Sequence, residues 1–129
     1  MKMHLESSEQ NLISNYGTGV LSVNGQDYHN NILITQTKLI ENWFSGDIKQ
    51  LCLAHFAPLF EQSETEQAEI LLLGTGSTHI FPDFGLMAEL RQRGIALEVM
   101  NTRAACRTYS VLVNEYRPVA AALIQLDGE

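Results

Sequence analysis

The residues best suited to chemistry fall in two short segments, each of which follows a predicted strand. Gly74-Thr75-Gly76 comes directly after an apolar run, and Thr102, Arg103 and Arg107 come after the next one. Glycine-rich turns bind anions through backbone N–H groups, and a helix N-terminus attracts anions through its dipole. These six residues therefore form a candidate binding site for a small anionic ligand.

Each part of this site also has a structural explanation, and both interpretations stay open at this point. The glycine turn matches neither GxGxxG nor a Walker loop, and a tight turn with positive φ needs the same glycines. Arg103 and Arg107 lie one helical turn apart, which also suits a solvent-exposed face or pairing with glutamates. The spacing alone does not separate a ligand site from ordinary structure.

No complete catalytic or metal-binding set is recognisable. Cys106 lies between the two arginines, where a lowered thiol pKa would make it reactive, but a small buried filler is the commoner role. His79 follows the glycine turn without an identifiable acidic or nucleophilic partner. The other histidines show no metal-ligand spacing with one another or with the cysteines. The sequence therefore predicts no catalytic residue, metal or cofactor, and an enzyme is the less favoured class.

An alternation of strands and helices from Ile70 to Leu126 must position these residues. Ile70–Leu73 is apolar at every position, as expected for a strand covered on both faces, and we predict that it is the central strand. The elements predicted after it are a helix at Pro82–Arg93, a strand at Ile95–Met100, a helix at Arg103–Tyr116 with Thr102 as N-cap, and a strand at Val119–Leu126. Parallel neighbours joined by a right-handed crossover would place the glycine turn opposite the Thr102 helix.

The first half of the chain favours short strands and tight turns. Asn24-Gly25 is the sharpest turn signal, and the β-branched run Ile32–Thr35 indicates a strand. A short helix is predicted near Ile48–His55, limited by Pro58. Residues 1–10 are polar and expected to be loosely ordered, residues 61–69 indicate a surface loop, and residues 11–129 are expected to form a single α/β domain.

Composition and charge exclude several classes of function. The formal net charge of -7 disfavours binding to nucleic acid and to anionic membrane surfaces. The two cysteines form no secretory framework, no signal peptide is recognisable, and no apolar run approaches the roughly 20 residues that cross a bilayer. We therefore expect a cytoplasmic protein without direct membrane insertion. An open sheet edge would favour a homodimer.

Several ordered motifs resemble one known family. They are Leu72-Leu73-Gly74-Thr75-Gly76, the segment from Ile95 to Thr102, Ala104-Ala105-Cys106-Arg107-Thr108-Tyr109, Val119–Leu123 and Tyr16-Gly17-Thr18-Gly19. Together they are similar to a conserved family of small domains of unknown function that includes the mitochondrial complex I assembly factor three and the adipogenesis-associated domain protein. The chain departs from the family pattern at Ser110, Tyr116 and Pro118, where the family usually has asparagine, glycine and a basic residue.

The resemblance implies a three-layer α/β fold with a central mixed sheet, helices on one side, and a small β portion with a helix on the other. It implies no established enzyme activity. Relatives that assemble a membrane respiratory complex, or that accompany protein-export genes, suggest a protein partner linked to membrane-protein assembly or export. We therefore favour a non-catalytic interaction or assembly-factor module, with the anion binder or an unrecognised enzyme as the alternative.

A module of this kind needs exposed apolar surface. The aromatic residues that could supply it, if they do not all pack in the core, are Trp43, Phe44, Phe56, Phe60, Phe81 and Phe84.

Overall fold

The computed structural model describes residues 10–61 and 67–127. The strands in these ranges are β1 (Ile13–Gly17), β2 (Val20–Val23), β3 (Gln26–Tyr28), β4 (Ile32–Ile34), β5 (Leu39–Glu41), β6 (Ile70–Gly74), β7 (Ala96–Met100) and β8 (Val119–Leu123). The helices are the 3₁₀ helices η1 (Ile48–Gln50) and η2 (Leu53–Glu61) and the α-helices α2 (Phe84–Gln92) and α3 (Thr102–Asn114). Most of residues 1–10 and of the predicted loop at 61–69 lies outside the described residues.

A five-stranded mixed sheet in the order β5-β4-β8-β6-β7 forms the middle of the molecule. β6 runs parallel to β7 and β8, whereas β4 runs antiparallel to β5 and β8. The prediction that Ile70–Leu73 is the central strand is wrong, because β8 holds that position and β6 lies beside it. Both strands are apolar throughout and covered on both faces, so their composition cannot rank them. β7 ends the sheet, so Glu98 lies in an edge strand.

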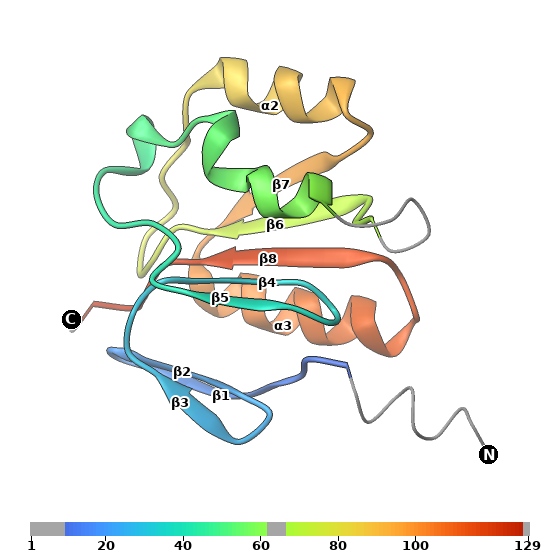
Figure 1. Ribbon diagram of the computed structural model, residues 1–129. Helices are drawn as coiled ribbons and strands as arrows, with labels where there is room; N and C mark the ends of the chain where they lie inside the picture. Colours follow the sequence, from blue (N-terminus) through green and yellow to red (C-terminus); the bar gives the residue numbers. More distant parts are fainter. Residues whose placement is uncertain (1–9, 62–66, 128–129) are drawn as a thin grey trace.

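Two apolar cores lie on opposite faces of this sheet. The first packs α2, η1 and η2 on one face, with Leu71 and Leu73 of β6 pointing into it. The second packs α3 and β1–β3 on the other face, and Leu72 points there. Figure 1 shows these layers, with α2 and α3 on either side of the five strands. The predicted three-layer α/β fold is confirmed.

The small sheet has the order β1-β2-β3 and is antiparallel throughout. Its β2–β3 turn is Asn24-Gly25, with φ of 54° and 82°, as the dipeptide predicts for a two-residue hairpin. Leu21 and Val23 of β2 are buried against the second core. This sheet therefore covers the same face as α3.

The helix predicted near Ile48–His55 is instead two 3₁₀ helices. Their hydrogen bonds span three residues, as in the bond from the Leu51 N–H to the Ile48 carbonyl. Phe56 and Leu59, three residues apart, are both fully buried, which matches the three residues per turn of a 3₁₀ helix. Pro58 lies inside η2 rather than ending it.

The predicted helix at Pro82–Arg93 is confirmed as α2, with a later start. Asp83 is its N-cap and accepts a hydrogen bond from the Gly85 N–H, so Pro82 precedes the helix. Among the residues that the structure describes, no helix has both the length and the apolar character needed to cross a bilayer.

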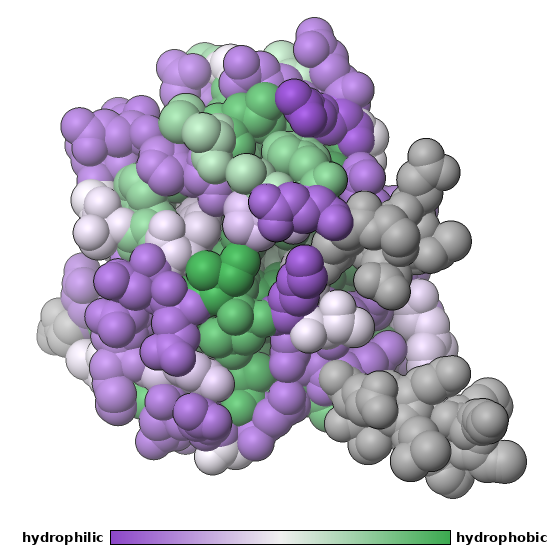
Figure 2. Space-filling model, in the orientation of Figure 1, coloured by the Kyte–Doolittle hydropathy of each residue, from purple (hydrophilic) through white to green (hydrophobic). Residues whose placement is uncertain are grey.

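The surface seen in Figure 2 is largely hydrophilic, with a band of hydrophobic residues over β5 and the small sheet. β5 ends the five-stranded sheet, and its Leu39 and Ile40 are only partly buried. This edge therefore shows some apolar surface.

Candidate functional site

Gly74 ends β6 where the first turn of α3 packs against the strand. A Cβ added at Gly74 would lie 2.9 Å from both Cα and Oγ1 of Thr102, and 3.1 Å from the Ala105 Cβ. Real Cβ atoms do not approach a backbone atom so closely, so the helix can rest on the strand only where the strand has no side chain. Close packing is thus a sufficient reason for glycine at this position.

The backbone N–H groups of the next two residues are already engaged inside the fold. The Thr75 N–H donates to the Met100 carbonyl at 2.9 Å, and the Gly76 N–H donates to Thr102 Oγ1 at 2.8 Å. Gly76 has φ of +95°, and its carbonyl accepts from the Thr102 N–H at 2.8 Å. An anion at this turn would have to displace one of these bonds.

Thr102 connects three elements rather than capping α3. The N-cap is Asn101, whose Oδ1 accepts from the Ala104 N–H at 2.9 Å. Thr102 is the first helical residue and is fully buried, and its hydroxyl donates to the Ile124 carbonyl at 2.7 Å while accepting from Gly76. The predicted N-cap was therefore one residue late, because both residue types favour that position. The structure does bring Gly74, Gly76 and Thr102 together, as the crossover predicts.

Arg103 and Arg107 lie on the exposed side of α3, one turn apart. Within residues 10–61 and 67–127 neither guanidinium has an ion pair or a hydrogen bond. The first turn of α3 contains no acidic residue that could pair with them. Positive charge near a helix N-terminus is unfavourable because the dipole is positive there. The two arginines thus stay uncompensated by the described residues.

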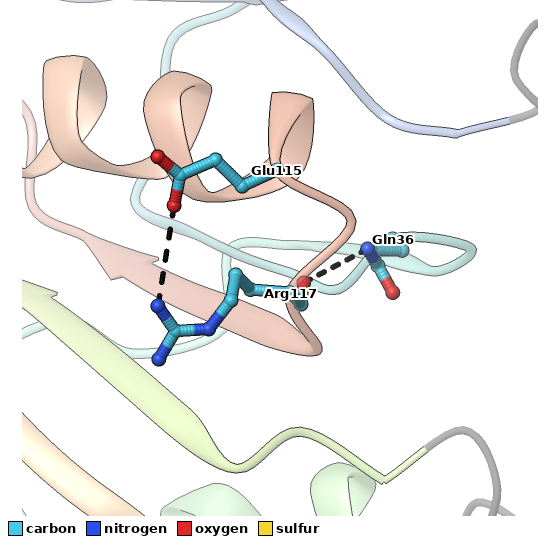
Figure 3. Close-up of polar contacts among 3 residues, drawn as sticks. All are labelled: Gln36, Glu115 and Arg117. Carbon is cyan, nitrogen blue, oxygen red and sulfur yellow. Dashed lines mark hydrogen bonds and ion pairs between the residues drawn. The ribbon is translucent and has the colours of Figure 1, made fainter.

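Arg117, beyond the end of α3, is held differently. Figure 3 shows its side chain directed at Glu115, at 4.0 Å, while Gln36 donates to its backbone carbonyl at 3.1 Å. Tyr116, the last residue of the predicted helix, lies beyond the end of α3 and is 77% exposed with φ of +60°. The Tyr116 and Arg117 N–H groups bond to the Val113 and Leu112 carbonyls, which is the Schellman pattern that favours glycine in place of Tyr116.

A groove of about 420 Å³ runs between β1 and α3. From the strand it is lined by residues 13–16, and from the helix by Cys106, Arg107, Ser110 and Val111. Arg107 is the one residue of the predicted anion site that lines it. Sequence reasoning missed the contribution of β1, because nothing in a short N-terminal strand signals that it will lie beside a helix some 90 residues later.

Cys106 is buried on α3 between the two arginines in sequence, in surroundings that disfavour its thiolate. Burial raises the pKa of its thiol from the usual 9.0 to about 12, while the positive charges of Arg107 and Arg103 act weakly in the opposite direction. A protonated thiol is a poor nucleophile, so the structure supports the role of a small buried filler.

The remaining titratable candidates do not form a catalytic or metal-binding set. The His79 ring contacts the Phe81 ring in a tilted arrangement, with 4.5 Å between the ring centroids. Exposed Cys52 lies with its Sγ 3.5 Å from His55 Nδ1, but that nitrogen also accepts the Cys52 backbone N–H. The Cys-x-x-His spacing was the only sequence signal for this pair. No group of three metal-ligating side chains occurs among the residues that could be described.

The aromatic residues divide into core and surface groups. Trp43 packs 5.5 Å from both Phe44 and Phe56, so the core interpretation holds for these three. Phe81 and Phe84 are instead 61% and 85% exposed, next to Ile80 at 36%. We call these last three residues the Phe81/Phe84 patch. It borders a hollow lined by residues 81–84 and by Lys49.

Comparison with known proteins identifies relatives over most of the chain. The chain is 32% identical over 123 residues to NADH dehydrogenase [ubiquinone] 1 alpha subcomplex assembly factor 3 of Xenopus tropicalis. The aligned region covers 95% of this chain and 66% of that protein. It is 26% identical over 110 residues to the 13 kDa major membrane protein of Francisella tularensis, covering 84% and 86% of the two chains. The present chain thus spans slightly less than two thirds of the assembly factor.

The fold is shared with solved structures of similar size. A crystal structure of a protein from Bordetella parapertussis superimposes with a TM-score of 0.79 at 26% identity, covering 90% of this chain and 96% of the other. Residues 13–124 match the family model described as "Protein of unknown function (DUF498/DUF598)". This chain belongs to that family.

Proposed function

We propose that this protein is a non-catalytic interaction module of the assembly-factor type, which binds a protein partner through the Phe81/Phe84 patch. The exposure of the two phenylalanines carries the proposal. Half of the exposed large hydrophobic side chains among the described residues fall within the five residues from Ile80 to Phe84. Aromatic side chains dominate the energetics of protein interfaces, and exposed apolar residues that lie together mark interaction sites.

The surroundings of the patch suit a partner that is apolar at the centre and polar at the rim. Lys49 and Asp83 border the hollow beside Phe81 and Phe84 and supply one charge of each sign. Burying a phenylalanine side chain stabilises a complex by about 1.5–3 kcal/mol. Loss of both rings should therefore weaken binding by about a hundredfold or more.

The names of relatives support the class of partner. One is named as an assembly factor of the NADH dehydrogenase 1 alpha subcomplex, and another is named as a membrane protein. We propose a client subunit of a membrane-associated complex, bound before or during its assembly, by a protein that resides in the cytoplasm.

A photo-crosslinking amino acid placed at position 84 in living cells tests the proposal. We expect a discrete adduct with one client protein, and no such adduct from the same amino acid at position 91, which is exposed on the same helix. The adduct should disappear in a Phe81→Ser background, because the neighbouring ring would no longer hold the partner.

The double variant Phe81→Ser, Phe84→Ser allows the contribution of the patch to binding affinity to be measured. Tyr116→Ser is the control, because it removes an exposed aromatic ring on the other side of the sheet. Purified client should bind the double variant far more weakly than the control. Equal binding by both variants would refute the proposal. So would a homodimer that buries the patch and dissociates in the double variant.

Small-anion binding is a second candidate, favoured by the guanidinium groups of Arg103 and Arg107, which form no ion pair with any residue that the structure describes. Thermal-shift screening against phosphate, nucleotides, dinucleotides and small carboxylates tests it. A stabilisation that grows with ligand concentration, and that Arg103→Ala, Arg107→Ala abolishes, would support the site. The absence of any shift would exclude it.

A further inference from the structure

The groove between β1 and α3 combines an outer strand with a helix that runs alongside it. β1 is the first strand in the order β1-β2-β3, and within residues 10–61 and 67–127 only β2 forms a ladder with it. In an antiparallel ladder, alternate residues direct their N–H and C=O groups away from the partner strand. The outer edge of β1 therefore offers a row of hydrogen-bonding groups to another extended chain.

The groove is held in shape by the fold rather than by a ligand. The Tyr109 hydroxyl donates at 2.9 Å to the carbonyl of Asn11, just before β1, and so connects the buried side of α3 to the start of the strand. Ile13 and Tyr16 pack against the same core as Tyr109. An incoming segment would therefore meet a preformed site and would bear little of the cost of ordering it.

The helix side of the groove presents one positive charge and one apolar side chain, one turn apart. Arg107 is exposed and without an ion pair among the described residues, and Val111 is 54% exposed. Four helical residues advance about 6 Å along the axis. Two residues of an extended chain advance about 6.7 Å, so alternate side chains on one face of a strand match this spacing.

We propose that this groove binds an extended segment of another protein, added as a strand along β1. The segment places an acidic side chain on Arg107 and an apolar side chain, two residues away, on Val111. Strand addition derives affinity from main-chain hydrogen bonds and specificity from alternate side chains, which are the two features that this groove supplies.

The charge distribution selects an acidic segment. The chain carries a formal net charge of -7, yet none of the described residues that line the groove is acidic, and Arg103 adds a second positive charge one turn before Arg107. An acidic segment is therefore attracted to this groove and repelled by most of the remaining surface. A small anion would leave the apolar lining of Ile13, Tyr16 and Val111 uncovered, whereas a peptide covers it.

A displayed library of short randomised peptides, selected against the whole protein, tests the inference. We expect enrichment of peptides with Asp or Glu two positions from an aliphatic residue. Arg107→Glu should weaken their binding by about tenfold or more, because it replaces an attractive charge by a repulsive one. Arg91→Glu, an equal charge change at an exposed residue of α2, should leave their binding within about twofold.

A second variant and a map of the site make the test decisive. Ser110→Trp fills the groove from the helix and should abolish peptide binding while the variant melts cooperatively like the wild type. In amide NMR spectra, the selected peptide should shift residues 13–16 and 106–111 and slow hydrogen exchange along the outer edge of β1. These residues are separate from the Phe81/Phe84 patch, so failure of either proposal leaves the other untouched.

Three results would overturn the inference. The first is a selection that yields no binder, or binders that Arg107→Glu does not weaken. The second is a selected peptide whose shifts map to the Phe81/Phe84 patch. The third is concentration-dependent self-association that Arg107→Glu abolishes, which would make a second copy of this chain the occupant.

Discussion

Replacing Thr102 by valine separates a structural from a ligand-binding role for this residue. Valine keeps the branched shape but removes the hydroxyl, which accepts from the Gly76 N–H at 2.8 Å and donates to the Ile124 carbonyl at 2.7 Å. Thr102 is fully buried, so water cannot replace these bonds without a rearrangement. A buried donor without a partner costs about 1–3 kcal/mol, and the lost bond to the carbonyl adds about 1 kcal/mol. We therefore expect the free energy of unfolding to fall by about 3 kcal/mol.

Urea unfolding followed by the fluorescence of Trp43, the single tryptophan, measures this change from the opposite core. For a chain of this length, the expected loss corresponds to a Tm lower by about 10 °C. Thr102→Ser keeps the hydroxyl and removes one methyl group, so it should cost only about 1 kcal/mol. Equal stability of the valine and serine variants would refute the structural role. Unchanged stability with the loss of an anion-induced thermal shift would instead assign Thr102 to a ligand site.

Three further predictions concern single positions. Gly74→Ala should destabilise the protein by at least about 2 kcal/mol, because the added Cβ would collide with the α3 backbone. Gly17→Ala is the control and should cost less than about 1 kcal/mol, because its added Cβ would lie 3.9 Å from the nearest atom. Equal melting temperatures of the two variants would contradict this prediction. Tyr116→Gly should raise the free energy of unfolding by about 1 kcal/mol, because it removes the strain of a side chain at positive φ. Tyr116→Ala keeps the Cβ and should give no such gain. An equal gain from both variants would contradict the explanation. Burial raises the pKa of Cys106 from 9.0 to about 12, so above pH 9 the thiol ionises in the unfolded chain but stays protonated in the folded protein. The contribution of Cys106 to the free energy of unfolding is therefore complete below pH 9 and falls above it by up to about 1.4 kcal/mol per pH unit. Denaturation at a series of alkaline pH values should therefore give a flatter profile for Cys106→Ala than for the wild type, with a shared residual slope from Tyr109, whose pKa burial also raises; parallel profiles would contradict the assignment.

The sequence alone determined the local elements whose signals lie within a few residues. Asn24-Gly25 predicts its hairpin because two successive residues must adopt positive φ, and these two residue types tolerate it. The apolar run at Ile70 predicts a strand covered on both faces, and the family motifs predict the three layers. The same motifs could not place β8 at the centre, since strand order depends on long-range pairing that no periodicity encodes.

Only the tertiary structure decided what the candidate residues do. The Thr102 hydroxyl acquires its role from Gly76 and Ile124, which lie 26 and 22 positions away in the chain. Phenylalanine is a residue type usually found in the core, but the path of the chain into α2 leaves Phe81 and Phe84 exposed to solvent. The groove beside Arg107 exists because β1 and α3, which are far apart in the sequence, pack side by side in the fold. A local pattern reports which side of an element is apolar, but contacts between distant elements determine which groups remain free to bind.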